Sequence, residues 1–265
     1  MLKIGVFDSG IGGMKIATSI FDQLTNVKIY YFADQAFSPY GDLSEAEIYR
    51  RCEVITSKFI DEGVDLIVVA CNTATSVSIE RLRDNFSLPF VGVEPDLNYF
   101  NRNMIPDSSS VGVLTTPVTM KMEKFNNLRE KLDPKNTFEY IPMPRLASLV
   151  EELFFCEEEG LNTFKNHIEK DLTNCMSKRL DYLVLGCTHY GLIDQFISDT
   201  LGVKTICPSM AVVRQVKSLL GTKLENEKTK LKNNEFYYLS SKIDNDFKKM
   251  NLEWKQRFKS EKLMS

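Results

Sequence analysis

The chain has few of the residues that build metal centres, disulfide frameworks or membrane spans. Its 265 residues include only two histidines, and none of the six cysteines has Cys-x-x-Cys spacing. A metal site is therefore not expected, and an even cysteine count does not imply disulfides in a reducing cytosol. No apolar run approaches the about 18 residues that a transmembrane helix needs, and no signal-peptide pattern opens the chain. These absences predict a cytoplasmic protein without membrane contact.

The overall composition is that of an ordinary globular protein. Hydrophobic residues make up 43% of the chain and charged residues 26%, with a net charge of −3. A direct nucleic-acid binder is usually basic, so none of this favours one. At this length the chain can form one large α/β domain or two smaller ones.

Short apolar runs alternate with amphipathic stretches of helical length. The runs cover 4–7, 29–32, 66–70, 90–93, 111–114, 138–141, 182–185, 203–206 and 236–239. Helical patterns cover 14–24, 44–62, 145–155 and 161–180, the second opening with a cap at Ser44. Alternating strands and helices indicate βαβ units and a mainly parallel sheet.

An internal echo suggests that the chain contains two related halves. Residues 4–9 resemble residues 111–116, and two cysteine motifs repeat at a similar offset. The polar segment 101–110 has the composition of a linker. We expect two α/β domains, the first made of 1–98 with 208–265 and the second of 99–207.

The end of the chain is expected to return to the first half. Phe247, Met250, Trp254 and Phe258 have helical spacing. They predict one apolar stripe that packs into the core.

The two repeated motifs each place a cysteine at the end of a predicted strand. Cys71 follows the apolar run 66–70, and Cys187 follows 182–186. In open α/β sheets, ligands bind beyond the carboxyl ends of the strands, so both thiols should face ligand space. Two thiols from two halves can flank one small molecule and exchange protons on opposite faces of a carbon.

The first strand ends in the motif Asp-Ser-Gly-Ile-Gly-Gly at 8–13, ahead of a predicted helix. This is neither a Rossmann fingerprint nor a P-loop, but a helix N-terminus offers free N–H groups to an anion. Asp8 is open to two interpretations. It caps the helix, or it contacts a substrate ammonium group or a catalytic thiol.

Further candidates are polar groups that follow strands or occupy turns. Pro39, Tyr40 and Gly41 form a turn that could direct backbone N–H groups and a phenol at a carboxylate. Neutral donors suited to carboxylates are Asn72, Thr73, Thr116, Thr119 and Thr188, although each could equally be an ordinary helix cap.

His189 and Glu151 complete the candidate set. His189 lies two residues after Cys187, where an imidazolium would lower the thiol pKa and supply thiolate. Glu151 lies within the helical pattern 145–155, and a surface helix charge is its default interpretation.

Together these motifs resemble the glutamate racemases of the cofactor-independent aspartate/glutamate racemase superfamily over nearly the full chain. The motifs are Gly-Val-Phe-Asp-Ser-Gly-Ile-Gly-Gly at 5–13, Pro-Tyr-Gly at 39–41, Val-Ala-Cys-Asn-Thr-Ala at 69–74, Gly-Val-Glu-Pro at 92–95 and Leu-Gly-Cys-Thr-His-Tyr at 185–190. Phe37 departs from the pattern, since an Arg is more typical there.

The resemblance implies two Rossmann-like domains related by a pseudo-twofold duplication, with the active site in the cleft between them. It implies no cofactor and assigns proton transfer at glutamate to Cys71 and Cys187. Asp8 and His189 would assist the thiols, and Glu151 matches a further acidic position. It places substrate contacts at Asp8, Ser9, Tyr40, Gly41, Asn72, Thr73, Thr188 and His189.

The same resemblance implies a supply of D-glutamate for peptidoglycan synthesis, and it allows a homodimer. Three alternatives stay open. A related racemase could prefer aspartate or another amino acid. Decarboxylation or cis-trans isomerisation is less favoured, because the decarboxylases of this superfamily resemble the pattern with one thiol and this chain has both. The non-enzyme alternative is a two-domain ligand-binding or regulatory protein.

Overall fold

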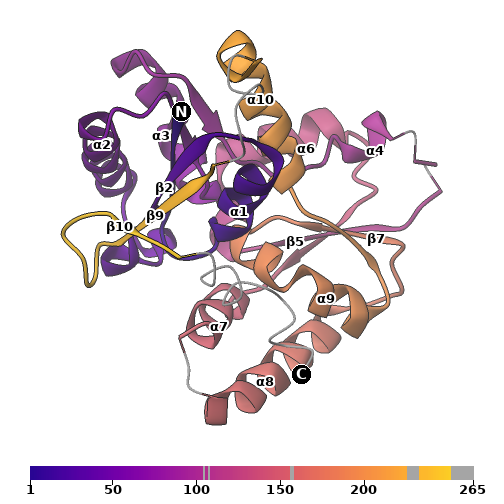
Figure 1. Cartoon of the computed structure of the whole chain (residues 1–265). Helices are drawn as coiled ribbons and strands as arrows, with labels where there is room; N and C mark the ends of the chain where they lie inside the picture. The colour runs from indigo at the N-terminus through magenta and orange to yellow at the C-terminus, as the bar shows by residue number, and fades with distance from the viewer. Residues whose placement is uncertain (104, 107, 156–157, 226–232, 252–265) are drawn as a thin grey trace. The chain divides into compact units, whose positions relative to one another are not determined.

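The computed structural model describes residues 1–103, 105–106, 108–155, 158–225 and 233–251, and the chain divides into two compact units (Figure 1). The first contains Met1–Val93 and the described residues from Ser209 onward, and the second contains Glu94–Pro208. The expected linker at 101–110 lies inside the second unit, where its first residues belong to helix α4 (Tyr99–Arg102).

The first unit is built on a sheet whose described strands run in the order β10-β9-β2-β1-β3-β4. The strands are β1 (Leu2–Asp8), β2 (Val27–Ala33), β3 (Leu66–Val69), β4 (Phe90–Gly92), β9 (Glu235–Ser240) and β10 (Lys248–Lys249). Every neighbouring pair is parallel except β10 with β9. The helices are α1 (Met14–Gln23), α2 (Glu45–Asp61), α3 (Asn72–Asn85) and α10 (Ser209–Glu225), with short turns η1 (Gln35–Phe37) and η2 (Tyr40–Asp42). α1 packs against α10 and α2 against α3.

The second unit has a parallel sheet in the order β6-β5-β7-β8. Its strands are β5 (Val111–Thr115), β6 (Glu139–Pro142), β7 (Tyr182–Leu185) and β8 (Lys204–Ile206). Its other helices are α5 (Pro117–Lys121), α6 (Glu123–Leu132), α7 (Leu146–Leu153), α8 (Glu158–Cys175), η3 (Thr188–Ile193) and α9 (Asp194–Leu201). None of the described helices of either unit is both long and apolar enough to cross a membrane.

The two units share one strand order. β2-β1-β3-β4 in the first matches β6-β5-β7-β8 in the second, so β1 corresponds to β5 and β3 to β7. The echo between 4–9 and 111–116 therefore falls on equivalent strands. Each predicted apolar run forms a strand, and the α/β class with mainly parallel sheets is confirmed. In this order the chain leaves β1 toward one edge and β3 toward the other, which creates a topological switch point.

The local sequence explains these elements. β3 is apolar at every position and wholly buried, as expected for a parallel strand with helices on both faces. α2 begins at Ser44 with a complete capping box, because the Ser44 side chain accepts from the Glu47 N–H and the Glu47 carboxylate accepts from the Ser44 N–H. The predicted cap is confirmed.

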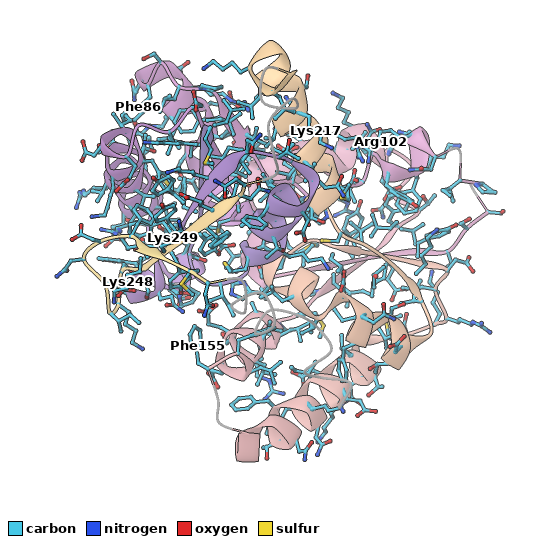
Figure 2. The ribbon with its side chains drawn as sticks, viewed as in Figure 1. Phe86, Arg102, Phe155, Lys217, Lys248 and Lys249 are labelled. Atoms are coloured by element: carbon cyan, nitrogen blue, oxygen red, sulfur yellow. The ribbon has the colours of Figure 1, made fainter. Side chains whose placement is uncertain are left out.

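The predicted C-terminal helical stripe is wrong over the described residues. Lys248 and Lys249, labelled in Figure 2, form β10 beside β9. Phe247 does reach the core of the first unit, with ring centroids 5.3 Å from Tyr30 and 5.8 Å from Phe59. The open edge of β9 offers backbone hydrogen bonds that override local helical spacing. Trp254 and Phe258 lie outside the described residues.

Asn234 fastens the returning chain to the first unit. Its Nδ2 donates to the carbonyl oxygens of Phe21 at 2.6 Å and Leu24 at 2.8 Å, and its Oδ1 accepts from the Val27 N–H at 3.2 Å. These three groups lie at the end of α1 and the start of β2. One amide therefore joins β9 to the helix and strand beside it.

Replacing Asn234 with Ala should destabilise the first unit by about 2 kcal/mol, because three partly buried backbone groups lose their partner. The matched control is Asn233→Ala, since only the backbone N–H of Asn233 bonds to Asn26. Thermal unfolding followed by circular dichroism measures both variants. Equal midpoints for the two would contradict this role of the Asn234 side chain.

Candidate active site

The switch point of the first unit brings Asp8 and Cys71 together at the carboxyl ends of β1 and β3. β1 and β3 are neighbours with Phe7 opposite Val69, and Asp8 and Cys71 follow that pair. The Cys71 thiol donates toward Ser9 Oγ at 3.9 Å, and Ser9 Oγ donates to Asp8 Oδ1 at 3.1 Å. A hydroxyl group thus connects the thiol to a buried carboxylate.

Cys71 is also the N-cap of α3. Its sulfur accepts from the Ala74 N–H at 3.5 Å, while its own backbone stays extended. A helix N-terminus carries positive partial charge and favours a thiolate over a neutral thiol. Asn72 and Thr73, the next two candidates, begin the helix and are buried beside it.

Asp8 does not cap α1. Its Oδ1 accepts from the Gly10 N–H at 3.1 Å, whereas the N-cap of α1 is Gly13 and has no side-chain hydrogen bond. A Cβ at Gly13 would lie 2.8 Å from Ala70 Cβ and 3.1 Å from Asp8 Cβ. Only glycine allows α1 to begin this close to the strand ends.

The second unit holds Cys187 at the equivalent place. Cys187 follows β7 and is the N-cap residue of η3. The Gly186 N–H donates to the Leu114 carbonyl at 2.7 Å, and a Cβ at Gly186 would lie 2.5 Å from that oxygen. A side chain at 186 would therefore push Cys187 away from the end of β5.

Cys187 is followed by a histidine–carboxylate pair. The Cys187 sulfur lies 3.9 Å from His189 Nδ1, and His189 Nε2 lies 2.7 Å from Glu151 Oε2. Glu151 belongs to α7, which packs against η3, so it is not the ordinary surface charge that its sequence context suggests. The carboxylate orients the imidazole and stabilises its protonated form. The structure brings these three predicted residues together.

Tyr190 holds η3 against the strand end of β5 and the residue after β6. Its side chain is wholly buried, and its hydroxyl donates to the carbonyls of Thr115 at 3.3 Å and Met143 at 3.4 Å. Burial raises the pKa of the phenol well above its usual value, so the hydroxyl keeps its proton. Thr188, the remaining candidate of η3, is also buried.

Thr116 and Thr119 use their side chains on each other. Thr116 caps α5 by accepting from the Thr119 N–H at 3.2 Å, and the two hydroxyl oxygens are 2.9 Å apart. This is the ordinary cap that the sequence already allowed for both residues.

In this structure the Tyr40 phenol is directed at a carboxylate of the protein itself. Its hydroxyl donates to Asp34 Oδ2 at 2.6 Å, and the ring is buried. Burial, and next the Asp34 carboxylate, raise the pKa of the phenol well above its usual value. The phenol therefore donates its proton within the first unit. The turn that contains Pro39 and Gly41 can present backbone N–H groups to a ligand at the start of η2.

Asp34 and Arg51 support this turn, and the sequence analysis identified neither of them. Asp34 is wholly buried and accepts two hydrogen bonds from the Arg51 guanidinium. A signal was present, because Asp34 directly follows β2 as Asp8 ends β1.

The two thiols thus share a pattern, in which one intervening group separates each from a carboxylate. Ser9 is that group for Cys71 and His189 for Cys187. Such groups are suited to general acid–base chemistry. Within the described residues, no group of three or more His, Cys, Asp or Glu side chains is placed to hold a metal ion.

Known proteins resemble the chain over most of its length. The model of the Asp/Glu/hydantoin racemase family matches residues 22–216. The glutamate racemase of Aliarcobacter butzleri is 40% identical over 225 residues, which cover 82% of this chain and 84% of that protein. Glutamate racemase 2 of Bacillus subtilis is 31% identical over 83% of this chain and 82% of that protein.

Solved structures agree with the sequence matches. The Escherichia coli glutamate racemase, in complex with L-glutamate and the activator UDP-MurNAc-Ala, superposes with a TM-score of 0.76 at 28% identity, covering 92% of this chain and 90% of that one. The Francisella tularensis enzyme in complex with D-glutamate gives 0.70 at 28% identity, covering 100% and 94%. The chain therefore belongs to the Asp/Glu/hydantoin racemase family and is an amino-acid racemase, as its motifs indicate.

Proposed function

We propose that this enzyme interconverts L- and D-glutamate without a cofactor, using Cys71 and Cys187 as its two proton-transfer groups. The observation that carries the proposal is the equivalent placement of one cysteine at the switch point of each unit, each connected to a carboxylate through one intervening side chain. Glutamate is the substrate in the names of relatives such as the Aliarcobacter butzleri glutamate racemase, and it is the ligand of two similar structures.

The proposed reaction uses one thiolate as base and the other thiol as acid. The α-carbon C–H bond breaks as a new S–H bond forms, and the resulting carbanion takes a proton from the opposite thiol. Inversion follows because the two protons enter and leave on opposite faces. Both sulfurs must reach one α-carbon at about 3.5 Å, so they would lie roughly 7 Å apart in the reacting state.

The α-proton is a very weak acid, so the thiols alone do not suffice. A general base contributes only about 10²–10⁴-fold. Hydrogen-bond donors around the developing charge must supply much of the remainder in a site closed to water. The side-chain donors we assign to substrate are Asn72, Thr73, Thr188 and the one hydroxyl proton that the mutual bond of Thr116 and Thr119 leaves over. The backbone donors are the N–H groups of Ser9, Tyr40 and Gly41, because the Ser9 hydroxyl donates to Asp8 and Pro39 has no N–H.

The two thiols would be activated differently. For Cys71, the Ala74 N–H and the α3 N-terminus stabilise the thiolate, while Ser9 and Asp8 accept its proton through hydrogen bonds. For Cys187, His189 pairs with the thiolate and Glu151 holds the imidazole. In the cell, we assign the reaction to the cytoplasm, where D-glutamate is consumed in peptidoglycan synthesis.

Solvent-isotope labelling tests the reaction directly. Each glutamate enantiomer is incubated with the protein in D₂O without added cofactor, and chirality and α-deuterium are followed by polarimetry and NMR. The opposite enantiomer should appear carrying solvent deuterium. Aspartate serves as the comparison substrate, and faster racemisation of aspartate than of glutamate would replace the proposed substrate. No racemisation of any amino acid would refute a catalytic role.

Cys71→Ser and Cys187→Ser should each slow racemisation at least about 10³-fold, because a hydroxyl is a far weaker acid than a thiol. Cys175→Ser, in α8 and outside both switch points, is the matched control and should retain parental activity. Initial rates in both directions provide the measurement. Either single site variant racemising like the parent would contradict the two-thiol assignment.

Cys71→Ser should also fold well, which separates chemistry from stability. A serine hydroxyl is a good N-cap, so it can replace the sulfur as acceptor of the Ala74 N–H. Cys71→Ala removes the acceptor and should be about 1 kcal/mol less stable than Cys71→Ser. Urea unfolding compares the pair, and an alanine variant as stable as the serine variant would rule out a capping role for this side chain.

A further inference from the structure

The turn that carries Tyr40 and Gly41 is attached to a buried ion pair. Asp34 accepts from Arg51 Nε at 2.9 Å, from Arg51 Nη2 at 2.8 Å and from the Tyr40 hydroxyl at 2.6 Å. Asp34 follows β2, and Arg51 projects from the middle of α2. The carboxylate thus links a strand end, a helix and the turn.

The same guanidinium also contacts η1, the short helix that precedes the turn. It lies over the Phe37 ring at 3.9 Å from the ring centroid, so the side chain is fixed by stacking as well as by its two hydrogen bonds. On its other side, η1 is attached to the end of β9. Ser240 Oγ donates to Gln35 Oε1 at 2.6 Å, and the Ala36 N–H donates to Ser241 Oγ at 3.0 Å.

These contacts require a particular set of chemical groups. A planar guanidinium can donate two parallel bonds to one carboxylate, and the ammonium group of a lysine cannot. A wholly buried carboxylate is costly unless its oxygens are satisfied, and here three donors satisfy them. The Tyr40 hydroxyl donates to Asp34, and this bond holds the side chain in place. The held side chain in turn fixes η2 and the direction of its backbone N–H groups.

We propose that Asp34 and Arg51 are positioning residues for a substrate carboxylate, acting through Tyr40 on the backbone N–H groups of the Tyr40–Gly41 turn. Neither residue touches the substrate. Loss of the pair lets the turn move and weakens binding, while the thiols at the switch points keep their surroundings. This inference rests on the proposed glutamate racemase function.

Steady-state kinetics on Arg51→Met and Tyr40→Phe test the inference. Each should raise KM for glutamate about tenfold, the equivalent of losing one hydrogen bond to a charged group, with kcat changed less than about threefold. Arg51→Lys should also raise KM, because a lysine keeps the positive charge but cannot donate two parallel hydrogen bonds to Asp34. The double variant should exceed the larger single effect by less than about twofold, since both changes release the same turn.

Two matched controls separate positioning from general loss of stability. Tyr49→Phe removes the hydroxyl of a second buried tyrosine, which lies in α2 and accepts a hydrogen bond from Asn85. Arg102→Met, at the position labelled in Figure 2, removes a guanidinium from the buried Asp96 of the second unit. Both should leave KM within about twofold of the parent. Partial unfolding would instead lower the apparent kcat at constant KM.

The outcomes distinguish this inference from the function beneath it. A parent enzyme that does not racemise glutamate would overturn the proposed function, and the inference with it. An active parent whose Arg51→Met and Tyr40→Phe variants keep the parental KM would overturn the inference alone. Control variants that raise KM as much as these two would also overturn the inference and leave the function standing.

Discussion

The divergence of the chain at two adjacent parallel strands is the constraint on which the candidate site depends. After β1 the chain turns to one edge of the sheet, and after β3 to the other, so the space beyond these two strand ends is left open. β5 and β7 repeat the arrangement. Residues that follow such strands are held by a rigid sheet on one side and face ligand space on the other.

Close backbone packing makes this arrangement possible. α1 begins against Ala70 and Asp8 only because residue 13 has no side chain, and Gly186 lies against the Leu114 carbonyl for the same reason. These contacts bring helix N-termini and strand ends together, and with them the N–H groups that can hold an anion. These two glycines therefore contribute by letting the backbone of one element lie close to its neighbour.

The two units treat equivalent thiols with different chemistry. Cys71 is surrounded by fixed dipoles, namely the Ala74 N–H and the Ser9 hydroxyl, with Asp8 behind them. Cys187 faces His189, which can change its protonation state, with Glu151 behind it. A common backbone topology thus supports two local environments. The shared strand order gives the two sulfurs equivalent positions, whereas their hydrogen-bond partners differ.

Sequence pattern alone determined the fold class and the place of both cysteines. Apolar runs long enough for strands, separated by amphipathic segments, leave few solutions except a parallel sheet covered on both faces. A polar residue directly after such a run then lies at the ligand edge, which located Asp8, Cys71 and Cys187. These inferences need only local periodicity and the geometry of parallel strands.

Only the tertiary structure decided which side chains meet. Glu151 and His189 are 38 positions apart, and their pairing depends on how α7 packs against η3. The Tyr40 hydroxyl bonds to Asp34 because β2 and α2 bring Asp34 and Arg51 next to this turn. Lys248–Lys249 form a strand because the edge of β9 can pair with them. Hydrogen bonds and edge pairing depend on distances between elements remote in the chain, and local sequence patterns carry no information about those distances.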